Sequence, residues 1–272
     1  MTENELILTS ILNCRCVDLY TQKPILNPSQ QARFDDIQKR RAKKEPLQYI
    51  LGSCEFMGLK FLVDERVLIP RSETELLVEA TIEGAKSIAK PFLHILDIGT
   101  GSGNIAVSLA KFIAHCRVVT VDISAEALEV ARDNAKLNGV SDRVTFFHGD
   151  LFQTRQNNAK DEILFDIIIS NPPYVNAVHL KRLQPEVCRE PIVAIDGGTD
   201  GLDFYRRIIG QAPQYLKDGG LLCFEIADGQ KKPIEEILNN DGRFTVTNFL
   251  NDYAQRERVI IAELKGNGKT RH

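Results

Sequence analysis

The chain has 272 residues, of which 43% are hydrophobic and 26% charged, with a formal net charge of −3 and a pI near 6.0. These ordinary globular values allow one large domain, or one medium domain with a smaller one. A slightly acidic chain has no overall field that would draw it onto nucleic acid or an acidic membrane. Because no apolar stretch approaches the roughly 20 residues of a membrane-spanning helix, we expect no membrane partner.

The cysteines indicate the compartment. Their scattered positions form no C-x-x-C pair, and no paired histidine spacing or apolar leader accompanies them: Cys14, Cys16, Cys54, Cys116, Cys188 and Cys223. We therefore expect reduced thiols, a cytoplasmic location in a bacterial cytosol or an organelle matrix, and no bound metal. A zinc site through Cys14 and Cys16 is a minor alternative, because further ligands at metal spacing are missing.

The N-terminal residues 1–52 predict a small helical domain. Apolar residues recur at helical spacing from Glu5 to Tyr20 and from Pro28 to Lys44. In "EPLQYILG", Pro46 suits a first helical position and Gly52 a helix end, which predicts a third, short helix. The next segment, "CEFMGLKFLVD", predicts two short strands around a turn, so residues 53–72 are expected to be a β-hairpin linker.

Residues 73–272 predict an α/β domain. From Phe92 onward, strands alternate with helices that begin at Asn104, at Ala125, near Phe204 and after Gly229. Such alternation is typical of a mostly parallel sheet covered on both faces, as in Rossmann-like folds. The last two strands, "RFTVTNFL" and "RERVIIAEL", have no helix between them. We therefore expect a seven-stranded sheet with an antiparallel pair at one edge.

A glycine-rich loop, "LDIGTGSGN", joins the first strand of this sheet to a helix, which is where ligands bind in open parallel sheets. Glycine lets the backbone turn sharply and approach a ligand closely. Asn104 stands where the NAD fingerprint needs its third glycine, and the ending of a phosphate-binding loop is absent. We expect a different cofactor to contact the whole loop: Gly99, Thr100, Gly101, Ser102 and Gly103.

Carboxylates end the next two strands. Asp122 follows "VVTV" and can accept both hydroxyls of a ribose, while Asp150 follows "FFHG" and can accept from an adenine amine. Leu151 is expected to cover the adenine ring, and Ile123 is also expected to contact the cofactor. Three strand ends that suit a nucleoside without pyrophosphate predict S-adenosylmethionine. The competing interpretation is an ordinary strand-to-helix turn with solvated acids.

The stretch "IISNPPYVN" ends a buried strand that we expect beside the glycine-loop strand. Asn171 would then emerge next to the methyl donor, where its side-chain oxygen and the Pro172 carbonyl can each accept one hydrogen of a planar –NH2 group. Proline pre-sets both acceptors, and Tyr174 can lie on the flat face of that group. We therefore predict a carboxamide or an aromatic amine as the methyl acceptor, and no strong base.

The ordered motifs "EPLQYILG", "LIPRSETE", "LDIGTGSGNIAVSLA", "SNPPYV", "REPIVAIDGGTDGLDFYR" and "DYAQRERV" resemble the HemK/PrmC family, the glutamine methyltransferases of peptide chain release factors. The resemblance runs from about Cys14 to Leu264. It implies a class I S-adenosylmethionine-dependent methyltransferase fold, and a release factor as protein substrate, methylated on the glutamine of its Gly-Gly-Gln loop. The implied catalytic and substrate-binding residues are Asn171, which also borders the cofactor, Pro172, Pro173, Tyr174 and Arg71.

Two other functions fit parts of the pattern. An adenine N(6)-methyltransferase would present the same –NH2 group to Asn171, but a base-flipping enzyme needs a broad cationic face. The dense basic run "KRRAKK", from Lys39 to Lys44, is more simply a solvated helix end. A non-catalytic scaffold is disfavoured, because both the glycine loop and the "NPPY" motif are present. We expect no stable binding to nucleic acid.

Overall fold

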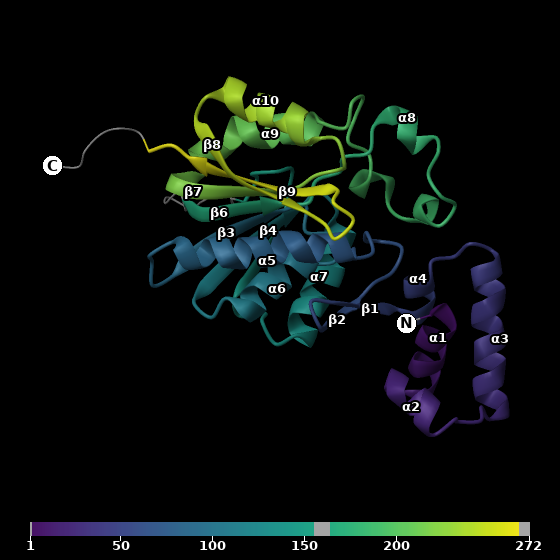
Figure 1. The fold of residues 1–272 in the computed structure, drawn as a ribbon. Coiled ribbons are helices and arrows are strands. Elements are labelled where there is room, and N and C mark those ends of the chain that lie inside the picture. The colour runs from purple at the N-terminus through teal and green to yellow at the C-terminus, as the bar shows by residue number, and fades with distance from the viewer. Residues whose placement is uncertain (1, 155–163, 267–272) are drawn as a thin grey trace.

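Four N-terminal helices stand beside a large sheet (Figure 1). The computed structural model describes residues 2–154 and 164–266. The helices are α1 (Glu3–Leu12), α2 (Cys16–Thr21), α3 (Pro28–Ala42) and α4 (Leu47–Leu51). Asn13 adopts a left-handed conformation with φ of 49° and ends α1, so the stretch predicted as helical from Glu5 to Tyr20 is divided in two. Ile7, Ile37 and Leu47 form the small buried core of these helices.

A β-hairpin follows, made of β1 (Ser53–Phe56) and β2 (Leu59–Leu62), as predicted. Met57 and Gly58 both have positive φ, which is the turn geometry that matches the twist of a two-residue hairpin. Asn134, on α7 (Ala125–Leu137), anchors the hairpin. Its side chain accepts from the Leu62 amide (2.6 Å) and donates to the carbonyls of Leu62 (2.9 Å) and Ser102 (2.8 Å).

The sheet has seven strands in the order β5-β4-β3-β6-β7-β9-β8. Their bounds are β3 (Leu93–Ile98), β4 (Cys116–Asp122), β5 (Val144–His148), β6 (Phe165–Ser170), β7 (Leu216–Glu225), β8 (Phe244–Asn251) and β9 (Glu257–Leu264). The strands from β5 to β7 are parallel, whereas β9 pairs antiparallel with both β7 and β8. The predicted mostly parallel seven-stranded sheet with an antiparallel edge pair is confirmed.

Helices cover both faces of the sheet, as Figure 1 shows. One face carries α5 (Ser72–Ser87), α6 (Asn104–Phe112) and α7, and the other carries α9 (Asp203–Gln211) and α10 (Lys231–Asp241). The sequence did not predict α5. Beyond the carboxyl end of β6 lie the short helix α8 (Ala177–Leu180) and two 3-10 turns, Val187–Arg189 and Ile192–Ala194, and a third turn, Ala212–Gln214, precedes β7. Within the described ranges, no helix is long and apolar enough to cross a membrane.

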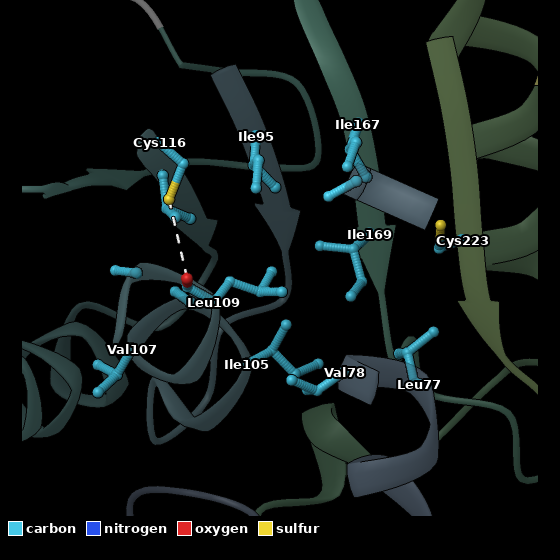
Figure 2. Packing of buried hydrophobic residues seen from close by; sticks show 14 of the residues in the cluster. Leu77, Val78, Ile95, Ile105, Val107, Leu109, Cys116, Ile167, Ile169 and Cys223 are labelled. Carbon is cyan, nitrogen blue, oxygen red and sulfur yellow. Dashed lines mark hydrogen bonds between the residues drawn. The ribbon is translucent and has the colours of Figure 1, made fainter. Parts of the chain in front are cut away.

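Alternating side chains of the central strands feed two cores, because successive residues of a strand point to opposite faces. Ile95 and Ile167 pack toward α5 and α6, and Figure 2 shows them on the same side as Leu77. Their neighbours Leu96 and Ile168 pack toward α9 and α10. Burial on both faces explains why apolar residues follow one another at the centres of β3 (Ile95 and Leu96) and β6 (Ile167–Ile169). The rigid centre of the sheet therefore positions the loops that follow these two strands.

Candidate active site

The carboxyl ends of β3 and β6 lie side by side. Ile98 pairs with Ser170 in the parallel ladder, and the Ser170 hydroxyl donates to the Ile98 carbonyl (2.7 Å). Gly99 and Asn171, the next residue of each strand, consequently emerge next to each other at the same edge of the sheet. The predicted neighbour relation between the glycine-loop strand and the "NPPY" strand is confirmed.

A single cavity is lined by twelve of the residues that the sequence predicted for the site: Arg71, Gly99, Thr100, Gly101, Ser102, Asp122, Ile123, Asp150, Leu151, Asn171, Pro172 and Pro173. Two predicted residues, Gly103 and Tyr174, do not line it. Gly103 begins α6 with φ of 81°, and a Cβ there would lie 3.0 Å from the Cβ of Ala131. Its glycine serves the close packing of α6 on α7.

The glycine loop offers bare backbone to the cavity. Gly99 and Gly101 have φ values of 77° and 53°, in the left-handed region that favours glycine. No atom would lie within 4 Å of a Cβ added at either position, so the space beside the loop is open. The loop itself is held by hydrogen bonds from the Gly99 amide to the Val121 carbonyl (2.9 Å) and from the Gly101 amide to Asp122 Oδ2 (2.8 Å).

Asp122 is fixed at the end of β4 by two backbone amides. Its Oδ2 accepts from Gly101, and its Oδ1 accepts from the Ser124 amide (2.9 Å). Burial raises the pKa of Asp122, while these two amide donors act in the opposite direction. Because each carboxylate oxygen has two lone pairs, each can still accept one hydroxyl. The geometry thus suits the two hydroxyls of a ribose.

Asp150 and Leu151 line the far end of the cavity, together with residues that the sequence did not predict. Arg207 of α9 donates to Asp150 Oδ2 in an ion pair that bridges 57 residues of sequence. The other carboxylate oxygen remains an acceptor. Leu151 has φ of 52° and is buried, and Phe204 of α9 also borders the cavity. An apolar and aromatic lining beside a carboxylate oxygen fits a heteroaromatic base with an amino group.

Asp97 lies immediately before the glycine loop and is another residue that the sequence did not single out. It is fully buried, and its Oδ2 accepts from the Thr120 hydroxyl (2.9 Å). Within the part of the chain that the structure describes, its Oδ1 has no hydrogen-bond partner. Burial raises the pKa of Asp97 to about 7. An orphaned buried oxygen beside a ligand loop is consistent with a site that a polar ligand completes.

The acceptor end of the cavity contains a hydrogen-bond network. The Asn171 side-chain amide donates through Nδ2 to the Thr74 hydroxyl (3.1 Å), and that hydroxyl donates to Glu225 Oε2 (2.6 Å). The Tyr174 hydroxyl donates to the other oxygen of Glu225 (3.4 Å). Glu225 is only 2% exposed, and burial raises its pKa to about 7. Tyr174 therefore faces inward to this network, and burial raises the pKa of its phenol.

The backbone of the "NPPY" motif is held by the glycines of "IDGGTDG". The Gly197 amide donates to the Val175 carbonyl (2.9 Å), and a Cβ on Gly197 would lie 2.7 Å from the Tyr174 Cα. Gly201 has φ of 80°, and a Cβ there would lie 2.4 Å from the Tyr174 carbonyl oxygen. Gln230 Nε2 also donates to that oxygen (3.3 Å). Only glycine permits these two close approaches.

A second pocket adjoins the acceptor end, and Arg71 lines both spaces. Arg71 pairs with Glu190, whose buried carboxylate also accepts from the Ile69 amide (3.2 Å). Pro46 of the N-terminal helical region and Tyr174 are among the other lining residues. This pocket therefore connects the acceptor end to the surface between the N-terminal helices and the segment after "NPPY".

Metal ligation has no structural counterpart in the described residues. Across residues 2–154 and 164–266, no group of three or more His, Cys, Asp or Glu side chains is placed to hold a metal ion. Cys14 and Cys16, the pair considered for zinc, are free thiols. The polar groups that line the cavity are instead carboxylates, side-chain amides, hydroxyls, guanidinium groups and backbone, which suit a nucleoside cofactor.

Comparison with known proteins decides the family. A model of the PrmC N-terminal domain matches residues 2–52, and a model of a methyltransferase domain matches residues 89–265. A release factor glutamine methyltransferase from Geobacter sulfurreducens is 46% identical over 243 residues, which cover 88% of this chain and 81% of the relative. The chain belongs to the release factor glutamine methyltransferase family. S-adenosylmethionine is accordingly its methyl donor.

Further comparisons agree with this family and with the fold. A release factor glutamine methyltransferase from Thermodesulfovibrio yellowstonii is 40% identical and covers 96% of this chain and 91% of its own length. The crystal structure of a methyltransferase from Pyrococcus furiosus has a TM-score of 0.55 at 20% identity, over 88% of this chain and 100% of that one. A T. thermophilus 16S rRNA methyltransferase, solved with AdoMet and guanosine, has a TM-score of 0.54 at 20% identity over 78% of this chain and 50% of that one. These structures establish the class I methyltransferase fold.

Proposed function

We propose that the chain transfers a methyl group from S-adenosylmethionine to the side-chain amide nitrogen of the glutamine in the Gly-Gly-Gln loop of a peptide chain release factor. The observation that carries the proposal is the placement of Asn171 directly beside the glycine loop, with its amide nitrogen bonded to Thr74. The names of the relatives, which identify release factor glutamine as the methylated group, support the same substrate.

We assign cofactor binding to the loop from Gly99 to Ser102, to Asp122 and Ile123, and to Asp150 and Leu151, which surround the cavity. When bound, S-adenosylmethionine supplies an electrophilic methyl group. Asp122 would accept the ribose hydroxyls, and Oδ1 of Asp150 would accept from the adenine amine. The open backbone at Gly99 and Gly101 lets the remainder of the cofactor approach the loop closely.

The acceptor residues overcome the low reactivity of an amide nitrogen, whose lone pair is delocalised. Asn171 Oδ1 and the Pro172 carbonyl would each accept one N–H, so that the nitrogen is held in a fixed orientation. Proline keeps both acceptors in place before the substrate arrives. The nitrogen becomes acidic as it gains the methyl group and can release its proton to water, so no protein base is assigned.

We further propose that residues 1–52 dock the release factor, that residues 53–72 link the two parts, and that residues 73–272 carry the chemistry. Pro46 and Gln48 line the pocket that adjoins Arg71, whereas none of the described residues 2–52 lines the cofactor cavity. Arg41 also pairs with Glu186, which ties the helices to the segment after "NPPY".

Removal of residues 1–52 is therefore expected to spare cofactor binding and to lower the methylation of an intact release factor at least about 10-fold. The measurement compares calorimetric cofactor affinity with methyl incorporation by the full-length and shortened proteins. Methylation of intact release factor at the full rate by the shortened protein would contradict the docking role.

The deciding experiment for the function locates the transferred methyl group. The protein is incubated with isotope-labelled S-adenosylmethionine and either a release factor or an adenine-containing duplex DNA, and the products are analysed by mass spectrometry. We expect label on the glutamine of the Gly-Gly-Gln loop. Label on adenine alone would overturn the proposal.

The basic run does not favour the DNA substrate, because part of its charge is already engaged within the protein. Arg40 pairs with Glu45, and Arg41 pairs with Glu3 and Glu186. We therefore propose no stable binding to nucleic acid. The substrate also implies the place of action, since release factors work where translation ends, in the cytosol or an organelle matrix.

A further inference from the structure

We propose that Thr74 and Glu225 are positioning residues that determine which way round the side-chain amide of Asn171 stands. This inference rests on the proposed function, because the orientation matters for a substrate that presents an –NH2 group. Neither residue lies near Asn171 in the sequence: Thr74 is 97 residues away, and Glu225 is 151 residues beyond Thr74.

The two ends of an asparagine amide are opposite in hydrogen bonding but almost equal in shape. The nitrogen donates and the oxygen accepts, so a rotation of the terminal group by 180° exchanges a donor for an acceptor. If the Asn171 nitrogen faced the cavity, two donors would meet at the substrate –NH2 group. One hydrogen of the substrate would then have no acceptor. Something in the protein must therefore favour the productive orientation.

The hydroxyl of Thr74 supplies this preference because it has a single proton. Glu225 Oε2 lies 2.6 Å from Thr74 Oγ1. The ionised carboxylate, which is the form present above its raised pKa of about 7, only accepts, so the proton of Thr74 is then directed to Glu225. The oxygen of Thr74 then has only lone pairs to offer to Asn171. The group of Asn171 at 3.1 Å must be the nitrogen, and Oδ1 is left for the substrate.

The network is anchored well enough to enforce a direction. Thr74 and Glu225 are both 2% exposed, so water cannot readily substitute for either partner. The main-chain carbonyl of Glu225 accepts from the Tyr205 hydroxyl (2.8 Å), and its second carboxylate oxygen accepts from Tyr174. Both the backbone and the carboxylate of Glu225 are consequently held by hydrogen bonds while the carboxylate orients Thr74.

The first test replaces the Thr74 hydroxyl without changing the size of the side chain. We expect Thr74→Val to lower kcat by about 10-fold, with the cofactor Kd within about 2-fold of the parent protein, and Thr74→Ser to retain most of the activity. Thr81→Val is the matched control, because Thr81 is a buried threonine of the same helix whose hydroxyl bonds to Leu77. Equal kcat in the Val and Ser variants of Thr74 would overturn the proposal.

The second test asks whether Thr74 acts through Asn171. In Asn171→Ala, the hydrogen-bonded pair Thr74 and Glu225 has no side-chain amide to orient. A further Thr74→Val change should therefore alter kcat by less than about 2-fold. If the second change instead lowers kcat by the same 10-fold factor, Thr74 acts on the substrate directly and the positioning role is wrong.

A third readout needs no substrate and separates this inference from the proposed function. The side-chain NH2 signals of Asn171 in 15N-labelled protein, assigned by their loss in Asn171→Ala, should move in Thr74→Val and stay in place in Thr81→Val. Unmoved signals in Thr74→Val overturn the positioning role even if release factor is methylated. Moved signals support it whichever substrate the protein methylates.

Discussion

The two sides of the cavity are built in different ways. The cofactor side, formed by Gly99–Ser102, Asp122 and Asp150, relies on short loops at strand ends, in which Asp122 accepts from two backbone amides and Asp150 pairs with Arg207 of α9. The acceptor side, formed by Asn171–Tyr174, relies on partners drawn from distant parts of the chain, including Thr74 and Glu225. Loops at the strand ends are sufficient to bind a flexible nucleoside, whereas a single planar amide must be held in one orientation by a rigid set of contacts.

The difference predicts that the two sides can be damaged separately. Changes on the acceptor side should lower turnover and leave cofactor affinity intact, and changes on the cofactor side should do the reverse. A variant that lowers turnover and cofactor affinity equally would show that the two sides of the cavity cannot be changed independently.

The largest effect is expected from Asn171→Ala. Loss of the orienting oxygen should reduce kcat by about 100-fold or more, while the cofactor Kd stays nearly unchanged. Steady-state methylation of a release factor and calorimetry with S-adenosylmethionine measure the two quantities. An equal loss of cofactor affinity would assign Asn171 to the cofactor side instead.

The next effect lies on the other side of the cavity. Asp122→Ala removes both the expected ribose acceptor and the acceptor for the Gly101 amide, so cofactor binding should weaken by about 1–3 kcal/mol. Calorimetry checks the affinity, and kcat at saturating cofactor should fall much less. Asp133→Ala, an exposed acid on α7, is the control for loss of one charge. Unchanged affinity in Asp122→Ala would contradict the ribose assignment.

A smaller effect is expected when the support of the acceptor backbone is disturbed. In Gly201→Ala, the new methyl group must displace the Tyr174 carbonyl from its present position, at a residue with φ of 80°. We expect kcat to fall by about 10-fold, with little change in cofactor affinity. Gly210→Ala is a matched control on α9, since a Cβ there meets no atom within 4 Å. Equal activity of the two variants would show that the close approach is not needed.

The last effect concerns stability rather than activity. Because burial raises the pKa of Glu225 from 4.5 to about 7, its ionised form is less favoured in the folded protein than in the unfolded chain. Its stabilising contribution is present at low pH and is lost as pH rises from about 4.5 through about 7. Relative to Glu225→Gln, which cannot titrate, the free energy of unfolding of the parent protein should fall by about 1–3 kcal/mol across this window.

Urea unfolding of the two proteins at pH 5 and pH 8 measures this difference. Glu79→Gln, a change of an exposed carboxylate on α5, serves as the control for loss of one charge. A constant difference between the parent protein and Glu225→Gln at both pH values would contradict the raised pKa.

Most of the cofactor side could be predicted from sequence because its glycine loop and its strand-end carboxylates are encoded locally. Glycines such as Gly99 and Gly101 are needed where the backbone turns sharply beside a ligand, and Asp122 stands at the end of an apolar strand. The position of Asn171 beside the glycine loop could be predicted from strand order, since the parallel topology places the end of β6 next to the end of β3.

The support of the acceptor side could not be predicted in the same way. The buried face of α5 includes Thr74 and Thr81 beside Leu77 and Val78, so threonines interrupt the apolar pattern that would have marked the helix. The contact between Thr74 and Glu225 joins α5 to β7 through the fold, and no local signal in either segment indicates it. Arg207 and Phe204 were missed for the same reason, because α9 reaches the cavity only in three dimensions.

The contacts of Asn134 affect how the N-terminal helices could be exchanged between members of this family. Its one side chain clasps both strand β2 of the hairpin and the Ser102 carbonyl of the glycine loop. Asn134 thus connects the hairpin to the α/β domain. A junction for a chimaera is best placed upstream of the hairpin, at Gly52, which has a left-handed conformation and ends α4. If the N-terminal helices of a relative are joined at Gly52, all the contacts of Asn134 are retained. If the junction lies beyond Leu62, strand β2, which Asn134 contacts, is replaced as well.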